Sequence, residues 1–173
     1  MTIHSSDPFA TPEGHRSPLR RLRGRMASPV TLWTVGEGRY RAGLTVSSIL
    51  IADGDPGRVA GIVDEESDLW PVLQTSGRFA VSLLGPGDEQ LADRFAGLLP
   101  APGGLFREPI WTDTPWGPVR EGAPAWAGCR LDASRPFGWG LLVEATIDEV
   151  NLTAPVAPLV HYRGRYRGLS GET

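Results

Sequence analysis

The sequence predicts a mainly β fold, a small antiparallel β-barrel with short helical insertions. Glycine and proline supply 22 and 16 of the 173 residues, well above average usage, so turns are frequent and elements short. Short runs rich in β-branched and aromatic residues recur between these turns. Most runs are separated by tight turns rather than by crossover helices, which argues against a parallel βαβ fold.

Six or seven strands are expected, and they account for most of the apolar residues. They cover residues 30–35, 42–52, 59–63, 79–84, 125–131, 140–152 and 159–162. The segment 42–52 reads as one long strand that carries Leu44-Thr45-Val46-Ser47-Ser48-Ile49-Leu50. Residues 100–124 contain six prolines and are expected to be loop.

Two short helices are expected between the strands. Residues 66–76 place Leu69 and Leu73 on one side at helical spacing. Residues 88–98 repeat Leu91, Phe95 and Leu98 at i, i+4 and i+7, with Asp88 as the N-cap. Neither helix is long enough to connect parallel strands throughout a sheet, which agrees with a barrel.

The chain divides into a tail and one domain. Residues 1–26 are polar and Arg-rich, and they are predicted to form a disordered N-terminal tail. The simplest interpretation is a solvated segment. The alternatives are a tether to nucleic acid or membrane, and a protein whose real start is Met26. Residues 27–173 are predicted to form a single folded domain.

Composition excludes several kinds of chemistry. No lysine is present, which excludes a Schiff-base lysine and a P-loop lysine. Cys129 is the one cysteine and His161 the one histidine outside the tail, so a disulfide or multi-histidine metal site is not expected. The net charge of −3 and the lack of a long apolar run or signal peptide predict a cytoplasmic protein without nucleic-acid or membrane partners. Its chemistry would then come from a bound cofactor.

The most informative residues are the hydroxyls of Thr45, Ser47 and Ser48, inside the apolar segment 42–52. Hydroxyls in an apolar strand need hydrogen-bond partners. They belong either to an edge strand that faces water, or to a set of donors for a polar ligand such as a phosphate or a ring carbonyl.

Six ordered segments together resemble the flavin reductase-like family, the FMN-binding split barrels, over about residues 28–169. They are Leu44-Thr45-Val46-Ser47-Ser48; Asp55-Pro56 with Val59-Ala60-Gly61-Ile62-Val63; Ser76-Gly77-Arg78-Phe79-Ala80-Val81-Ser82-Leu83-Leu84; Gln90-Leu91-Ala92-Asp93-Arg94-Phe95-Ala96-Gly97; Ala125-Trp126-Ala127-Gly128-Cys129; and Pro158-Leu159-Val160-His161-Tyr162-Arg163-Gly164-Arg165-Tyr166. The resemblance implies a split β-barrel that forms a homodimer, with one FMN, or sometimes FAD, per subunit at the dimer interface. NADH or NADPH would reduce the flavin, which often leaves to supply a separate monooxygenase.

The resemblance also implies which residues bind the cofactor. The flavin ring and ribityl chain would lie against Thr45, Val46, Ser47 and Ser48. The ribityl phosphate would lie near Asp64, Glu65, Glu66 and Ser67. Arg94 and Phe95 would lie near the phosphate or the ring, and Tyr166 would close the site. The alternative for Phe95 is that it anchors its helix in the core. Cys129 is interpreted more simply as a small buried side chain than as a nucleophile.

Two positions depart from the family pattern. Many members carry Gly-Asp-His where this chain has Phe137-Gly138-Trp139-Gly140, so Trp139 replaces a histidine on the nicotinamide side. Tryptophan stacks on rings but does not titrate. The second departure is Asp64-Glu65-Glu66, whose carboxylates would repel a phosphate unless they face solvent.

The leading hypothesis is an NAD(P)H-dependent flavin reductase that supplies reduced FMN to a monooxygenase. One alternative is an oxidoreductase that uses flavin or deazaflavin on another substrate. Another is a flavin-binding module without turnover. The sequence alone leaves these alternatives open, and hydride transfer needs no acid because the cofactor carries that chemistry.

Overall fold

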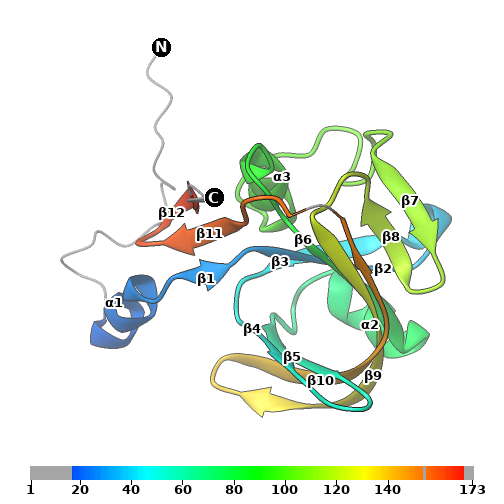
Figure 1. Cartoon of the computed structure of the whole chain (residues 1–173), viewed down its shortest axis with the longest axis horizontal. Helices are drawn as coiled ribbons and strands as arrows, with labels where there is room; N and C mark the ends of the chain where they lie inside the picture. Colours follow the sequence, from blue (N-terminus) through cyan, green and yellow to red (C-terminus); the bar gives the residue numbers. More distant parts are fainter. Residues whose placement is uncertain (1–16, 154, 170–173) are drawn as a thin grey trace.

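A curled, seven-stranded antiparallel sheet forms the body of the computed structural model, which describes residues 17–153 and 155–169 (Figure 1). Its strands are β2 (Thr31–Val35), β3 (Ala42–Val46), β4 (Ile49–Ala52), β5 (Arg58–Val63), β6 (Arg78–Leu83), β9 (Ala125–Phe137) and β10 (Gly140–Leu152). Smaller sheets contain β1 (Ser28–Pro29), β11 (Leu159–Tyr162) and β12 (Arg165–Gly168), and β7 (Trp111–Thr114) and β8 (Gly117–Arg120). The helices are α1 (Pro18–Arg25), α2 (Leu69–Ser76) and α3 (Glu89–Phe95), with a 3-10 turn at Gly38–Tyr40. The mainly β fold class is thus confirmed.

The strand order explains why the sheet curls. It runs β3-β2-β6-β9-β10-β5-β4, so β3 and β4 lie at opposite edges although only Ser47 and Ser48 separate them in the chain. The chain from Val46 to Ile49 spans at most about 11 Å, so the two edges must approach each other there. The long strand expected over 42–52 is therefore wrong. It is two strands joined across a seam.

The inside of the curl holds the larger core. Trp33 is fully buried and stacks on Phe79, with 4.7 Å between the ring centroids. Leu69 and Leu73 of α2 complete this core, because α2 packs against β2, β3 and β6. Gly61 allows the Trp33 ring to approach β5, because a Cβ on Gly61 would lie 2.5 Å from Cζ2 of that ring.

A second core lies outside the curl, under α3. Leu91, Ala92 and Phe95 of α3 pack against buried residues of β2 and β11, including Leu32 and Leu159. Strand β2 therefore has a core on each face, which explains why all five of its residues are buried. The expected helices are confirmed as α2 and α3, each somewhat shorter than predicted.

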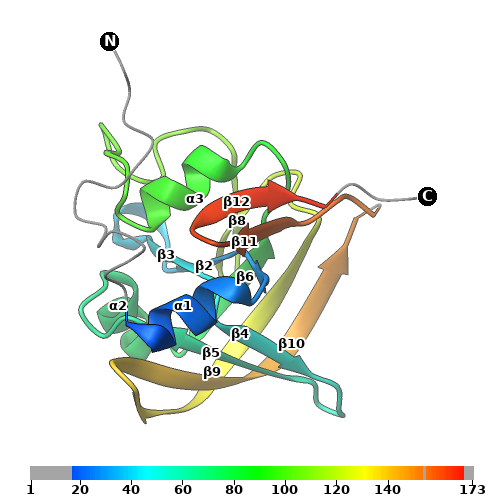
Figure 2. The same cartoon turned by 90° about the vertical axis from the view of Figure 1, so that its left-hand side faces the viewer.

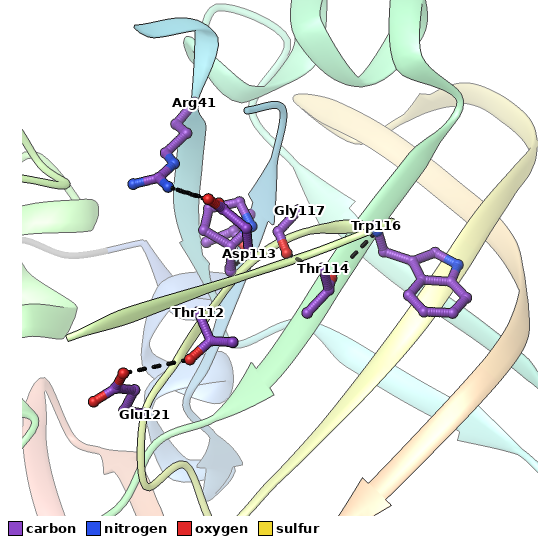
Figure 3. Close-up of polar contacts among 9 residues, drawn as sticks. Arg41, Thr112, Asp113, Thr114, Trp116, Gly117 and Glu121 are labelled. Atoms are coloured by element: carbon purple, nitrogen blue, oxygen red, sulfur yellow. Dashed lines mark hydrogen bonds and ion pairs between the residues drawn. The ribbon is translucent and has the colours of Figure 1, made fainter. Parts of the chain in front are cut away.

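The segment 100–124, expected to be loop, contains the β7–β8 hairpin (Figure 3). Asp113 accepts hydrogen bonds of 2.6 and 2.7 Å at its two carboxylate oxygens from Nη2 of Arg41. Thr114 Oγ1 donates to Gly117 O at 2.6 Å and accepts from the N–H of Trp116 at 3.2 Å, which closes the turn. The Trp116 ring lies directly over Gly128, where a Cβ would be 2.3 Å from Cδ2 of the ring. The hairpin is thereby tied to Arg41, the residue before β3, and to β9.

The N-terminal tail also differs from the prediction. The part of it that covers residues 1–16 lies outside the described residues. Pro18–Arg25 is helical, with Ser17 Oγ accepting a hydrogen bond from Arg20 N–H at 3.3 Å, so the prediction of disorder is wrong for that segment. In the described parts of the chain, 17–153 and 155–169, no helix combines the length and apolar character needed to cross a membrane.

Candidate functional site

The seam between β3 and β4 carries two hydroxyls that the fold does not use. Ser47 and Ser48 are half-buried, and among residues 17–153 and 155–169 neither hydroxyl has a hydrogen-bond partner. The backbone of Ser48 is fixed, because its carbonyl accepts a hydrogen bond of 2.9 Å from Ile62 N–H. The seam thus carries two hydroxyls without a partner in the described residues, next to a backbone that is held at Ser48.

An open apolar groove begins beside the seam and follows β4. Its volume is about 430 Å³, within the range of small-molecule sites. Its walls include Thr31, Ile49, Ile51, Trp126, Ile147 and Val150. The Thr31 hydroxyl already donates to Val46 O at 2.6 Å, so the groove is almost entirely apolar. The groove was not predicted from the sequence, although three successive apolar residues at 49–51 on an edge strand are a signal for it.

The turn between β5 and α2 lies next to the seam. Asp64 follows Val63, the last residue of β5, and is two residues after Ile62, whose N–H bonds to Ser48 O. The Asp64 carboxylate accepts a hydrogen bond of 2.9 Å from Glu66 N–H, and Ser67 Oγ donates to Asp64 O at 2.6 Å. The acidic side chains of this turn, Asp64, Glu65 and Glu66, are exposed to solvent. The hydroxyl of Ser67 is already bonded to Asp64 O. The turn therefore offers a ligand no unused hydroxyl.

The β9–β10 hairpin brings Trp139 to the same end of the barrel. Leu141 pairs with Val63, and a Cβ on Gly140 would lie 2.8 Å from Val63 O. The tip must turn sharply, because Gly138 has φ 61°. The Trp139 side chain is fully exposed, so its aromatic faces are available to a planar ring.

Thr45 and Val46, also predicted to contact the ligand, are engaged by the fold itself. Thr45 Oγ1 donates to Ala92 O of α3 at 2.7 Å. The Val46 side chain is buried in the core inside the curl. Val46 is the last residue of β3, so the in-and-out alternation of side chains along β3 ends there and does not continue into β4. The structure leaves no contact surface on Val46 for a ligand.

The predicted residues on α3 belong to a different neighbourhood. Phe95 is a core residue, since it packs against the rings of Phe106 and Trp111 and closely against Gly43. Arg94 forms an ion pair with Glu108 and lines a hollow between α3 and the loop that follows it. The structure does not bring these two side chains to the seam hydroxyls.

Tyr166 lies in a third place, on β12 beside α3. Its hydroxyl bonds to Asp93, and burial together with that carboxylate raises its pKa well above the ordinary value. Its ring meets His161 edge-on at 5.7 Å between centroids. Burial and then the nearby Arg23 guanidinium lower the pKa of His161, although Asp93 opposes the shift. The bond between Tyr166 and Asp93 ties β12 to α3.

Cys129 has no features of a nucleophile. Its side chain is buried in the larger core, and burial, with a smaller contribution from Asp148, raises the pKa of its thiol to about 12. A thiolate is therefore scarce at neutral pH. Among the described residues, no three His, Cys, Asp or Glu side chains converge as metal ligands do.

The comparisons with known proteins agree with this architecture. Residues 23–170 match the family model described as flavin reductase like domain, and the match begins within α1. The chain is 36% identical over 154 residues to the reductase component of 4-hydroxyphenylacetate 3-monooxygenase from Thermus thermophilus, which covers 89% of this chain and 97% of that protein.

Two further proteins are similar over most of the chain. The NADH:FMN oxidoreductase of Rhodococcus qingshengii is 28% identical over 157 residues, which are 88% of this chain and 79% of that protein. Among solved structures, BorF, the flavin reductase component of a bacterial two-component tryptophan halogenase, superposes with a TM-score of 0.79 at 25% identity. That superposition covers 89% of this chain and 98% of BorF.

Proposed function

The chain belongs to the flavin reductase like family, and from this premise we propose that it oxidises NADH or NADPH, reduces FMN or FAD, and passes the reduced flavin to a separate monooxygenase. Relatives named as reductase components of monooxygenases and as an NADH:FMN oxidoreductase support the reaction and the kind of partner. The observation that carries the site assignment is the pair of unused hydroxyls beside an apolar groove.

The seam and groove suit the chemistry of a flavin. A flavin combines a planar, largely apolar ring system with a polyhydroxylated chain. The groove offers about 430 Å³ of apolar space, and Ser47 and Ser48 precede its wall residue Ile49 in the chain. We therefore propose that the ring lies along β4 and that the chain hydroxyls bond to Ser47 and Ser48.

When bound, the flavin would supply the hydride chemistry, and the protein's residues would bind and orient it. The apolar walls of the groove would exclude water from one face of the ring. Ser47 and Ser48, the second of which is held by the backbone bond from Ile62, would fix its position along the groove. Trp139 would offer an aromatic surface at the end of the barrel where the seam opens.

The acidic turn argues for loose binding of the phosphate. Asp64, Glu65 and Glu66 are exposed, and no arginine forms an ion pair with them in the described parts of the chain. Carboxylates near a phosphate dianion repel it. Weak binding is useful to an enzyme whose reduced product must leave for a partner.

The function is tested by mixing catalytic amounts of protein with NADH or NADPH and with FMN, FAD or riboflavin under air. We expect nicotinamide consumption that depends on both the protein and the flavin. Binding of flavin without consumption of either nicotinamide would instead support a flavin-binding module.

Substituting Ser47→Ala or Ser48→Ala is expected to weaken FMN binding by about 2- to 13-fold each, the effect of losing one neutral hydrogen bond. The double variant should bind more weakly than either single variant. Quenching of flavin fluorescence measures the affinity, and thermal melts check that folding is unchanged.

Thr112→Ala is the matched control, because Thr112 is an exposed hydroxyl on β7, in the hairpin shown in Figure 3. Its affinity for FMN should equal that of the unmodified protein. Unchanged affinity in both serine variants and in the double variant would remove the site from the seam.

A further inference from the structure

A hollow of about 620 Å³ lies between α3 and the α3–β7 loop, residues 96–110. That volume is within the range of small-molecule sites, and the hollow shares no lining residue with the groove along β4. Figures 1 and 2 both show the α3–β7 loop at the opposite end of the molecule from the tip of the β9–β10 hairpin. The hollow is therefore distinct from the groove proposed for the flavin ring.

One wall of the hollow is the outer side of α3. Gln90 and Arg94 are four residues apart and share that side of the helix, while Leu91 and Phe95 pack into the core beneath it. Arg94 is already engaged, because its guanidinium forms an ion pair with Glu108 of the α3–β7 loop. The Gln90 amide has no hydrogen-bond partner among residues 17–153 and 155–169. This wall therefore offers a ligand an unused amide and a guanidinium whose charge is already balanced.

The other wall is the α3–β7 loop, whose shape is fixed by its own contacts. The N–H of Gly104 donates to Ala101 O at 2.9 Å and closes a turn. The Arg107 side chain crosses this turn, because its Nη1 donates to Pro102 O at 3.2 Å. Gly103 makes the crossing possible: its φ is 85°, and a Cβ there would lie 2.6 Å from Cδ of Arg107. The Arg107 side chain is therefore held in place by the loop itself.

Most of the lining between these polar groups is apolar. Leu105 packs against the core under α3, whereas Leu99 is 40% exposed and leaves apolar surface open to the hollow. The apolar side chains of the lining are those of Leu99, Pro100, Ala101, Pro102, Leu105 and Pro109. Apolar walls with a few polar groups are typical of sites that bind a small organic molecule. The body of a ligand that fits this hollow is therefore apolar.

Arg107 decides the charge of the ligand. Three charged residues line the hollow, and two of them, Arg94 and Glu108, pair with each other. Arg107 has no ion-pair partner in the parts of the chain that the structure describes. The lining thus has one unbalanced positive charge, which a single carboxylate would satisfy through charge-assisted hydrogen bonds. A dianion would be disfavoured, because Glu108 would repel its second charge.

We infer that this hollow binds a small organic monoanion with an apolar body, of which an aromatic carboxylate is the simplest example. The carboxylate would accept hydrogen bonds from the Arg107 guanidinium, with the Gln90 amide as a further donor on the helix wall. The ring would lie against Leu99 and Leu105. The inference goes beyond the proposed reaction and does not depend on it, because it uses neither the seam serines nor a flavin.

Calorimetric titration of the full chain with benzoate and with phenylacetate tests the inference. Both should bind saturably, with a dissociation constant in the millimolar range or tighter. Benzamide keeps the ring without the charge, and acetate keeps the charge without the ring, so each should bind at least about tenfold more weakly than benzoate. Inorganic phosphate should not compete with benzoate. Equal binding of benzoate and benzamide, competition by phosphate, or no saturable binding of either aromatic carboxylate contradicts the inference.

Three variants locate the bound carboxylate. Arg107→Gln should weaken benzoate binding at least about tenfold, because it removes the unbalanced charge. Glu108→Gln should act in the opposite direction and tighten binding several-fold, because it frees the Arg94 guanidinium and removes a negative charge from the lining. Arg135→Gln, which changes an exposed arginine near the end of β9, is the matched control and should have no effect.

The direction of the change at Glu108 separates recognition of the anion from a purely structural role. A loop that only loses its shape would bind benzoate more weakly in both variants, and thermal melts check the fold of each. Weaker binding by Glu108→Gln, or equal weakening by Arg107→Gln and Arg135→Gln, contradicts the inference. Flavin reduction without carboxylate binding would reject this site alone, and carboxylate binding without flavin reduction would reject the proposed reaction alone.

Discussion

Replacing Trp33 by alanine is expected to lower the free energy of unfolding by about 3–5 kcal/mol, the range for large aromatic side chains removed from a core. Trp33 is fully buried at the centre of the larger core, stacked on Phe79 and pressed against Gly61. No neighbouring element can fill the space, because β2 is held on both sides by β3 and β6. Its Nε1 has no hydrogen-bond partner among the described residues, so the loss is one of packing.

Urea denaturation, followed by circular dichroism, measures this change. Trp139→Ala is the matched control: it removes the same side chain from a fully exposed position and should change stability by less than about 0.5 kcal/mol. A loss below about 1 kcal/mol at Trp33 would mean that the sheet does not close around this ring as described.

Replacing Asp88 by alanine should cost about 3 kcal/mol, because it removes one member of a largely buried ion pair. Asp88 is 4% exposed, and its two oxygens contact Arg120 Nη2 at 2.6 Å and Gly85 N–H at 3.0 Å. Without the carboxylate, the partly buried guanidinium and a buried N–H lose their partner together. The figure is at the low end of the range for buried pairs because Arg120 keeps some contact with water.

Glu108→Ala provides the comparison. Its ion pair with Arg94 is more exposed, so its loss should cost less than about 1 kcal/mol. Thermal or urea unfolding of the two variants side by side measures the difference. Equal effects would show that burial does not distinguish these two pairs.

The fold class could be predicted from the sequence because it depends on local patterns. Turn residues, short apolar runs and the i, i+4 spacing in α3 all report on nearby positions. The seam could not be predicted in the same way. That β3 and β4 occupy opposite edges depends on which strands pair, and pairing joins residues far apart in the chain, such as Gly61 with Val143.

Two hairpins were missed although their turns have local signals. Thr114-Pro115-Trp116-Gly117 places proline and glycine where a β-turn prefers them, but the surrounding prolines suggested loop. Arg163 and Gly164 both have positive φ, 53° and 76°, which is typical of a two-residue hairpin turn. Arginine is unusual at the first of these positions, so the sequence did not indicate the turn.

Helix α1 was missed for a different reason. Ser17-Pro18 is a recognisable start, since serine caps a helix and proline is tolerated in its first turn. The density of arginine pointed instead to a solvated segment, and the helix indeed buries nothing within its own chain. An apolar stripe at i, i+3 and i+7, formed by Leu19, Leu22 and Met26, was the signal that should have been weighed against the charge.

The candidate site was predictable only in part. Sequence reasoning selected Ser47 and Ser48 because neighbouring hydroxyls are unusual in an apolar segment. It could not tell them from Thr45 and Ser67, whose hydroxyls are bonded to Ala92 O and Asp64 O. Whether a hydroxyl is free for a ligand is decided by backbone carbonyls that the fold brings near, and these are not visible in the pattern of residues.

Anaerobic mixing of the flavin-loaded protein with NADH or NADPH tests the central claim most directly. The visible absorbance of the oxidised flavin should be lost much faster than in a mixture of the same flavin and nicotinamide without protein. The Ser47→Ala/Ser48→Ala variant should need more flavin to reach the same rate. Bleaching no faster than in buffer with either nicotinamide, although the flavin is bound, would contradict the assignment of this chain as a flavin reductase.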